Sequence, residues 1–162
     1  MVMKKLLLIL LIFFTVACDY SNVSEEAKNE YINKKEELTK KEKFENIDNI
    51  PFDITISLDR INEEEITYRV IIDNAKEDIS NIKALLIHDY FTEDIFPSIG
   101  ILDDTINLKH NAENEEKGFM LVGYINTKES LEKLKIEFRL LVEYTDTEKK
   151  EHKIYYKTTN FS

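Results

Sequence analysis

Residues that crosslink chains or shape tight loops are scarce in this 162-residue sequence. It contains one cysteine, two prolines, three glycines and no tryptophan. A single cysteine excludes an internal disulfide and the cysteine clusters of zinc sites. Low glycine and proline contents exclude collagen-like and low-complexity chains. The hydrophobic residues, 43% of the total, are enough for the buried core of one domain.

Basic residues are outnumbered as well. The chain has 22 lysines and arginines against 32 aspartates and glutamates, a formal net charge of −10. Proteins that bind nucleic acids neutralise phosphates with clustered lysine and arginine. We therefore expect no nucleic-acid partner.

Residues 1–17 have the three-part pattern of a removable signal peptide. Lys4 and Lys5 provide positive charge, an uninterrupted apolar run extends from Leu6 to Phe14, and a small residue, Ala17, precedes Cys18. The run is too short for the roughly 30 Å hydrocarbon core of a membrane, which needs about 20 helical residues. The pattern predicts cleavage after residue 17. The alternative is a short anchor helix or a buried core helix.

The tetrad Thr15-Val16-Ala17-Cys18 resembles the lipobox of bacterial lipoproteins, with Thr15 where leucine is usual. The resemblance implies a diacylglycerol on the Cys18 thiol and an anchor on the extracytoplasmic face of the cell membrane. Two acyl chains suffice for stable anchoring without a basic patch. Cleavage would remove two of the 22 basic residues and no acidic one, taking the formal charge from −10 to about −12, which disfavours contact with anionic headgroups.

Glutamate and lysine dominate the next segment, from Ser24 to Asn46. Pairs four residues apart support a helix; they are Glu30/Lys34, Glu36/Lys40 and Glu37/Lys41. The apolar stripe is thin and consists of Ala27, Tyr31 and Leu38. We expect residues 18–49 to be the lipidated cysteine and a charged, partly helical, solvated stalk roughly 30 Å long. A partner-binding or coiled-coil helix is the alternative.

From residue 50 onward the hydrophobic period becomes two, as in half-buried strands. Six segments show strand patterns: Phe52–Leu58, Ile66–Ile72, Ile82–Tyr90, Phe119–Ile125, Leu134–Val142 and His152–Tyr156. The third and fourth are apolar on both faces, which is typical of central strands. Residues 91–115 offer a seventh strand. No long amphipathic helix interrupts the series, so residues 50–162 are predicted to form an all-β, antiparallel sandwich.

The run from Tyr68 to Asn74, a charged turn, and the run from Asp78 to Ile87 are similar to the B–C strand region of bacterial immunoglobulin-like surface domains. The resemblance implies an immunoglobulin-like β-sandwich of about seven strands that serves as a spacer, adhesion unit or accessory module. The Cys-Trp-Cys core of antibody domains is absent, because the chain has one cysteine and no tryptophan.

No residue pattern indicates catalysis, a metal or a cofactor. Ser98 lacks the spacing of a nucleophile elbow and has no histidine nearby. His88, His110 and His152 lie too far apart in sequence for a zinc motif, and we expect His88 to be a hydrogen-bonded histidine within a sheet. Acidic clusters at residues 89–94 and 103–104 could supply oxygens to Ca²⁺, but they lack a glycine-containing loop. We therefore predict that the protein is not an enzyme.

The apolar stretch 95–102 is the most distinctive candidate for a contact with another molecule. Phe96, Pro97 and Ile99 would touch an envelope protein or a wall polymer if the stretch were exposed. Alternatively, the stretch crosses over and folds Phe96, Ile99 and Leu102 onto one end of the sandwich. These observations predict a non-enzymatic binding, spacer or accessory module of the bacterial envelope. The alternative is a small-ligand or ion-binding lipoprotein with a pocket near residues 91–115.

Overall fold

The computed structural model describes residues 25–90 and 98–159. Cys18, Phe96 and Pro97 therefore lie outside the described residues. The described part contains one α-helix, two short 3-10 helices (Ile47–Asn49 and Glu115–Lys117) and seven strands. The helix and strands are α1 (Glu25–Lys40), β1 (Asp53–Asn62), β2 (Glu65–Asp73), β3 (Ile79–His88), β4 (Ser98–Leu108), β5 (Gly118–Asn126), β6 (Glu137–Thr145) and β7 (Glu151–Thr159).

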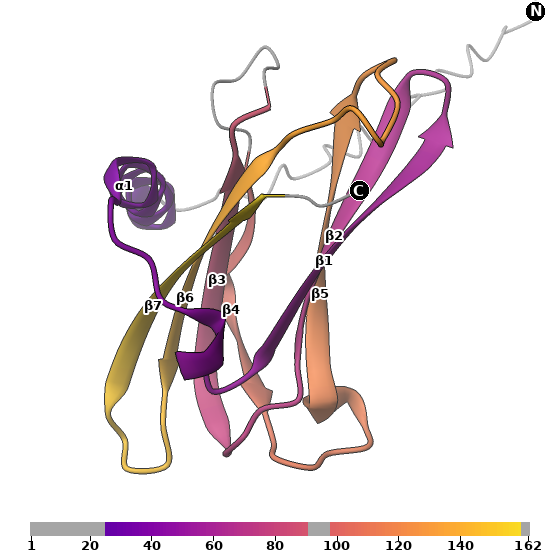
Figure 1. Cartoon of the computed structure of the whole chain (residues 1–162). Helices are drawn as coiled ribbons and strands as arrows, with labels where there is room; N and C mark the ends of the chain where they lie inside the picture. Colours follow the sequence, from indigo (N-terminus) through magenta and orange to yellow (C-terminus); the bar gives the residue numbers. More distant parts are fainter. Residues whose placement is uncertain (1–24, 91–97, 160–162) are drawn as a thin grey trace, which may run out of the picture.

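The strands form two antiparallel sheets (Figure 1). One has the order β1-β2-β5 and the other the order β4-β3-β6-β7. The expectation of a mainly antiparallel β fold is confirmed, and β4 is the additional strand expected between residues 91 and 115. Its pairing with β3 contains register shifts, which explains why period-two alternation is weak in this part of the sequence.

The main core lies between the two sheets. Alternate residues of β6, such as Phe138 and Leu140, face inward and meet Tyr68 and Val70 of β2. Phe138 is 1% exposed and its ring lies 5.5 Å from that of Tyr68. The inward set predicted for this segment, Ile136, Phe138 and Leu140, is thus confirmed.

A second apolar cluster covers the outer face of the four-stranded sheet. Leu38 of α1 is fully buried against Leu85, Ile87, Leu141 and Tyr155. Figure 1 shows α1 lying beside this sheet. The helix was predicted correctly, but the solvated stalk is wrong. The strands under α1 carry several apolar side chains on their outer face as well as on their inner one, and burial of these outer side chains stabilises the docked helix.

Charged groups surround this apolar contact. Lys83 Nζ lies 2.8 Å from Glu30, and Lys153 Nζ lies 3.1 Å from Glu37. Lys153 also lies 2.8 Å from Glu143 of β6. A further hydrogen bond of 2.6 Å runs from the Arg139 guanidinium to the Thr39 carbonyl at the end of the helix. The charges that suggested a solvated surface therefore bind the helix to the sheet.

The position of β5 differs from the sequence prediction. Its apolar residues on both faces suggested a central strand, yet within the described residues β5 pairs with β2 alone and forms the edge of its sheet. Its inward residues Leu121 and Ile125 are buried, whereas its outward residues remain exposed. One apolar face of β5 is thus uncovered.

Candidate interaction surface

The described part of the apolar stretch 95–102 belongs to β4. Ile99 faces Leu86 across the β3–β4 pairing and packs, partly buried, against the main core. Leu102 packs against the cluster below α1. Both side chains pack onto the domain, as the crossover alternative expected, but they belong to a strand at the edge of the four-stranded sheet and not to a crossover over one end of the sandwich. Partner contact by Phe96 and Pro97 stays a prediction.

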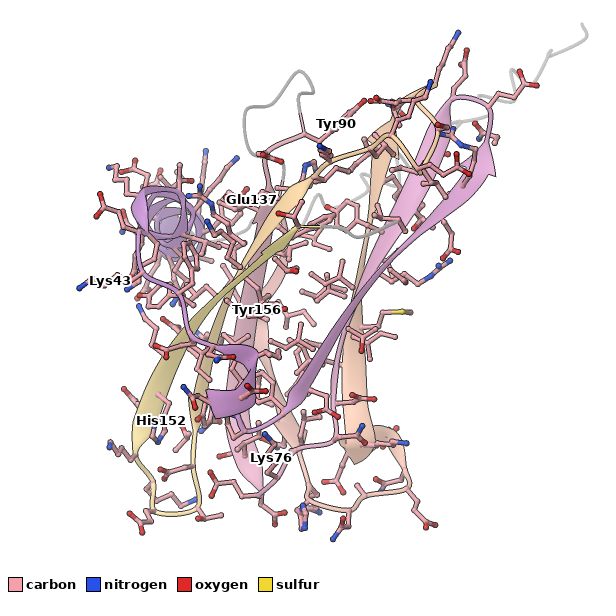
Figure 2. The ribbon with its side chains drawn as sticks, viewed as in Figure 1. Lys43, Lys76, Tyr90, Glu137, His152 and Tyr156 are labelled. Atoms are coloured by element: carbon pink, nitrogen blue, oxygen red, sulfur yellow. The ribbon has the colours of Figure 1, made fainter. Side chains whose placement is uncertain are left out.

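The three histidines are well separated. His88 lies at the end of β3, two residues before Tyr90, and Figure 2 shows His152 on β7 toward the opposite end of the sheet. His152 Nε2 is 2.6 Å from Asp146 Oδ2, and His110 Nδ1 is 2.9 Å from the Ala75 carbonyl. Within the described residues, no cluster of three or more histidine, cysteine or carboxylate side chains could hold a metal ion.

His88 is unusual because it is only 1% exposed, and neither ring nitrogen has a hydrogen-bond partner among the described residues. Its ring packs edge-on against Tyr68 at 5.3 Å and against Phe138 at 6.0 Å. Burial among these rings lowers its pKa from 6.5 to about 4, because the charged form would lose its hydration. Burial in the sheet was expected, but the expected hydrogen bonding is wrong. The imidazole acts as an aromatic core residue.

The hollows on the surface are open, and several of the charges that line them are ion-paired. One hollow, lined by β3, β6 and β7, has a volume of about 620 Å³, and its lysines are Lys83 and Lys153, both ion-paired. A second hollow, of about 470 Å³, borders Asn107–Lys109 in the region where the alternative prediction placed a ligand pocket. There the Lys109 ammonium lies 2.8 Å from the Glu116 carboxylate. Small-molecule sites are concave and mostly apolar with a few convergent polar groups, so a ligand pocket near residues 91–115 stays a prediction.

The strand β5 presents the most unusual surface of the described structure. None of its nine residues is charged, although 33% of the chain is. Its outward side chains are Met120, Val122 and Tyr124, which are 49%, 37% and 61% exposed. The other edge strands, β1, β4 and β7, each contain at least two charged residues. Charges on edge strands prevent unwanted pairing, and β5 lacks this protection.

The backbone of the same three residues faces the open edge of the sheet. The Asn74 N–H donates to the Lys117 carbonyl at one end of the β2–β5 pairing, and the Thr127 N–H donates to the Glu64 carbonyl at the other. Both bonds join residues that face each other when the β2–β5 register, in which Tyr68 faces Gly123, is extended by one residue at each end. Hydrogen-bonding direction alternates along an antiparallel strand. The odd-numbered residues of β5 therefore bond to β2, and residues 120, 122 and 124 direct their N–H and C=O groups away from it.

The inner side of β5 fits tightly against β2. A side chain at Gly123 would place its Cβ 2.2 Å from the ring of Tyr68, its partner in the register. Glycine at this position lets the Tyr68 ring pack directly against the strand backbone. On the outer side, the Thr67 hydroxyl donates a 3.2 Å bond to the Gly123 carbonyl. These contacts hold β5 in its sheet, and no strand of the described part of the chain pairs with its outer edge.

Sequence reasoning recognised β5 as apolar on both faces but did not identify its outward side as a candidate site. The signal that could have identified it is the absence of charge over nine residues in a highly charged chain. Within the part of the chain that is described, no helix is both long and apolar enough to cross a bilayer.

Comparisons with known proteins do not assign the chain to a family. No family model matches the sequence, and no curated protein matches it. Among solved structures, a crystal structure of a Bordetella pertussis protein provisionally called ApaA is similar, with 10% sequence identity and a TM-score of 0.43. The similarity covers 67% of this chain and 93% of the other.

Proposed function

We propose that the protein is a lipid-anchored, non-enzymatic interaction module of the bacterial cell envelope, held at the extracytoplasmic face by Cys18. The anchor is supported by the lipobox-like tetrad that ends at Cys18 and by the short apolar run before it. The acidic composition supports a domain that touches the membrane only through its lipid.

The proposal includes an immunoglobulin-like fold for the two packed sheets. In such sandwiches the first, second and fifth strands share one sheet, and the third, sixth and seventh share the other. The same grouping occurs here, with β4 added beside β3. Envelope proteins use modules of this architecture as spacers and as adhesion units, which fits the proposed role.

The observation that carries the proposed function is the uncharged, exposed edge of β5. Tyrosine and methionine are enriched where proteins contact one another, and charged residues are depleted. An open strand edge binds a further strand through main-chain hydrogen bonds, while alternate side chains provide specificity. Met120, Val122 and Tyr124 supply both the backbone groups and the side chains for such binding.

A photo-crosslinking amino acid at position 122 of the full chain tests this function in bacterial membranes. We expect a protein adduct from position 122. Ser57 is the matched control, because it lies on the outer face at the same level but on the far strand β1. Adducts of equal yield from both positions, or from neither, would show that β5 is not the interaction surface.

The anchor requires its own experiment. Replacing Cys18 with alanine should abolish labelling by radioactive palmitate, and should release the protein from membranes or leave an uncleaved precursor. A Cys18→Ala variant that is cleaved normally and still sediments with membranes would contradict the lipid anchor.

A further inference from the structure

We propose that β5 pairs with β5 of a second copy of this chain, antiparallel, about a two-fold axis at Val122. This inference rests on the proposed function and deepens it by naming the partner. The pairing would join two three-stranded sheets into one sheet of order β1-β2-β5-β5-β2-β1.

The backbone of β5 is self-complementary in this arrangement. With Val122 facing Val122 of the second copy, Met120 faces Tyr124 and Tyr124 faces Met120. All three residues direct their N–H and C=O groups to the open edge, as the bonds at both ends of the β2–β5 pairing show. Each facing pair can therefore exchange two hydrogen bonds. No shift interrupts the β2–β5 register, so the strand is regular enough to accept another.

Electrostatics favours β5 over the other edges for contact between two copies. Each copy has a formal charge of −10, or about −12 after removal of residues 1–17, so two copies repel one another in general. Along the nine residues of β5 no charge opposes approach. By contrast, β4 contains two aspartates and no basic residue, and β1 and β7 contain charges of both signs that a second copy would have to match. Two copies anchored in the same membrane would also meet at a raised effective concentration.

Pairing would also account for the apolar pattern of β5. The outward side chains of Met120, Val122 and Tyr124 would meet those of the second copy on one face of the joined sheet. Methionine sulfur makes favourable contacts with aromatic rings, and this register places Met120 opposite Tyr124. β5 would then be a central strand of the joined sheet, and the side chains of the second copy would cover part of the surface of Met120, Val122 and Tyr124, which are now 37–61% exposed.

Cysteine crosslinking in isolated membranes that contain the full chain tests the pairing. In a hydrogen-bonded antiparallel pair the Cα atoms are about 5.5 Å apart, which suits a disulfide. Val122→Cys should therefore give a covalent dimer of twice the monomer mass on mild oxidation. Ser57→Cys is the control, because the two Ser57 residues would be five strand spacings, about 24 Å, apart. The wild-type chain controls for crosslinking through Cys18.

The register has a separate test. Co-expressed Met120→Cys and Tyr124→Cys chains should crosslink with each other, whereas Met120→Cys alone should not, because its two copies would be offset by four residues, about 14 Å. Val122→Lys should abolish the dimer by placing two like charges face to face, and Ser57→Lys should leave it intact. A far-ultraviolet circular dichroism melt of both lysine variants verifies folding.

The outcomes separate this inference from the function on which it rests. Dimer from Val122→Cys and not from Ser57→Cys supports self-pairing. Equal yields from the two variants overturn it. If position 122 photo-crosslinks only to a different protein, self-pairing is wrong and the interaction module stands. If position 122 gives no adduct at all, both proposals fail.

Discussion

Truncating Leu38 to alanine should release α1 from the sheet and leave the two-sheet core folded. Leu38 is the fully buried residue of the helix, and its side chain fills a contact formed by Leu85, Ile87, Leu141 and Tyr155. None of these residues belongs to the main core between the sheets. The perturbation should therefore act on the docking of the helix.

The expected magnitude follows from the burial of this side chain. Leucine-to-alanine changes at buried sites cost about 2–5 kcal/mol. The surrounding ion pairs are partly exposed, and pairs of that kind contribute roughly 0–1 kcal/mol each. A released 16-residue helix is marginally stable in water. The population of the released helix should thus rise at least about 30-fold, which corresponds to 2 kcal/mol.

Native-state amide hydrogen exchange provides the measurement. We expect protection to fall along Glu25–Lys40 and to stay unchanged in β3 and β6. Ile32→Ala is the matched control, because Ile32 is an aliphatic residue of the same helix but is 40% exposed; such a change should stay within about 0.5 kcal/mol. Equal effects of the two substitutions, or loss of protection throughout both sheets, would refute this account of docking.

Three further predictions concern the core and the dependence on pH. Phe138→Ala should lower the free energy of unfolding by roughly 3–5 kcal/mol in a urea melt, whereas Glu137→Ala should change it by about 1 kcal/mol or less; similar losses would contradict the inward assignment. Burial lowers the pKa of His88 in the folded protein to about 4, whereas the unfolded chain keeps a pKa near 6.5. As the pH falls below 6.5, the unfolded chain therefore binds a proton before the folded protein does. Stability should then decrease by about 3 kcal/mol between pH 6.5 and 4, and His88→Phe should remove this part of the slope; an unchanged slope would assign it to other groups. A hydrogen bond from Lys83 lowers the pKa of the Glu30 carboxyl below 4.5. Burial raises the pKa of the Glu143 carboxyl, but hydrogen bonds from Lys153 and Lys34 outweigh burial, so this pKa also lies below 4.5. Glu30 and Glu143 should therefore stabilise the docked helix fully above pH 4.5, and this stabilisation should be lost as the pH falls below 4.5. If the NMR resonances of α1 do not shift in an acid titration, docking does not depend on the ionisation of these carboxylates.

Local patterns in the sequence were sufficient to predict most of the strands. Apolar residues at alternate positions, such as Ile136, Phe138 and Leu140, show which side of a strand faces the core. Successive side chains point to opposite faces of any strand, whatever packs against those faces. Helix formation in the Glu- and Lys-rich segment was also predictable, since pairs such as Glu36 and Lys40, 3.0 Å apart, depend only on spacing along one helix. The antiparallel fold class followed from the absence of long crossover helices.

Tertiary structure decided what covers each face of the sheets, because that depends on contacts between distant segments. The sequence around Leu38 does not show that this side chain is buried, because its burial depends on the outer apolar residues of β3, β6 and β7. The sequence of β5 likewise indicates two apolar faces, but α1 covers the other sheet and the outward face of β5 stays exposed, while the strand order places β5 at an edge. The candidate interaction surface therefore arises from the strand order and from which sheet the helix covers, since local alternation specifies neither.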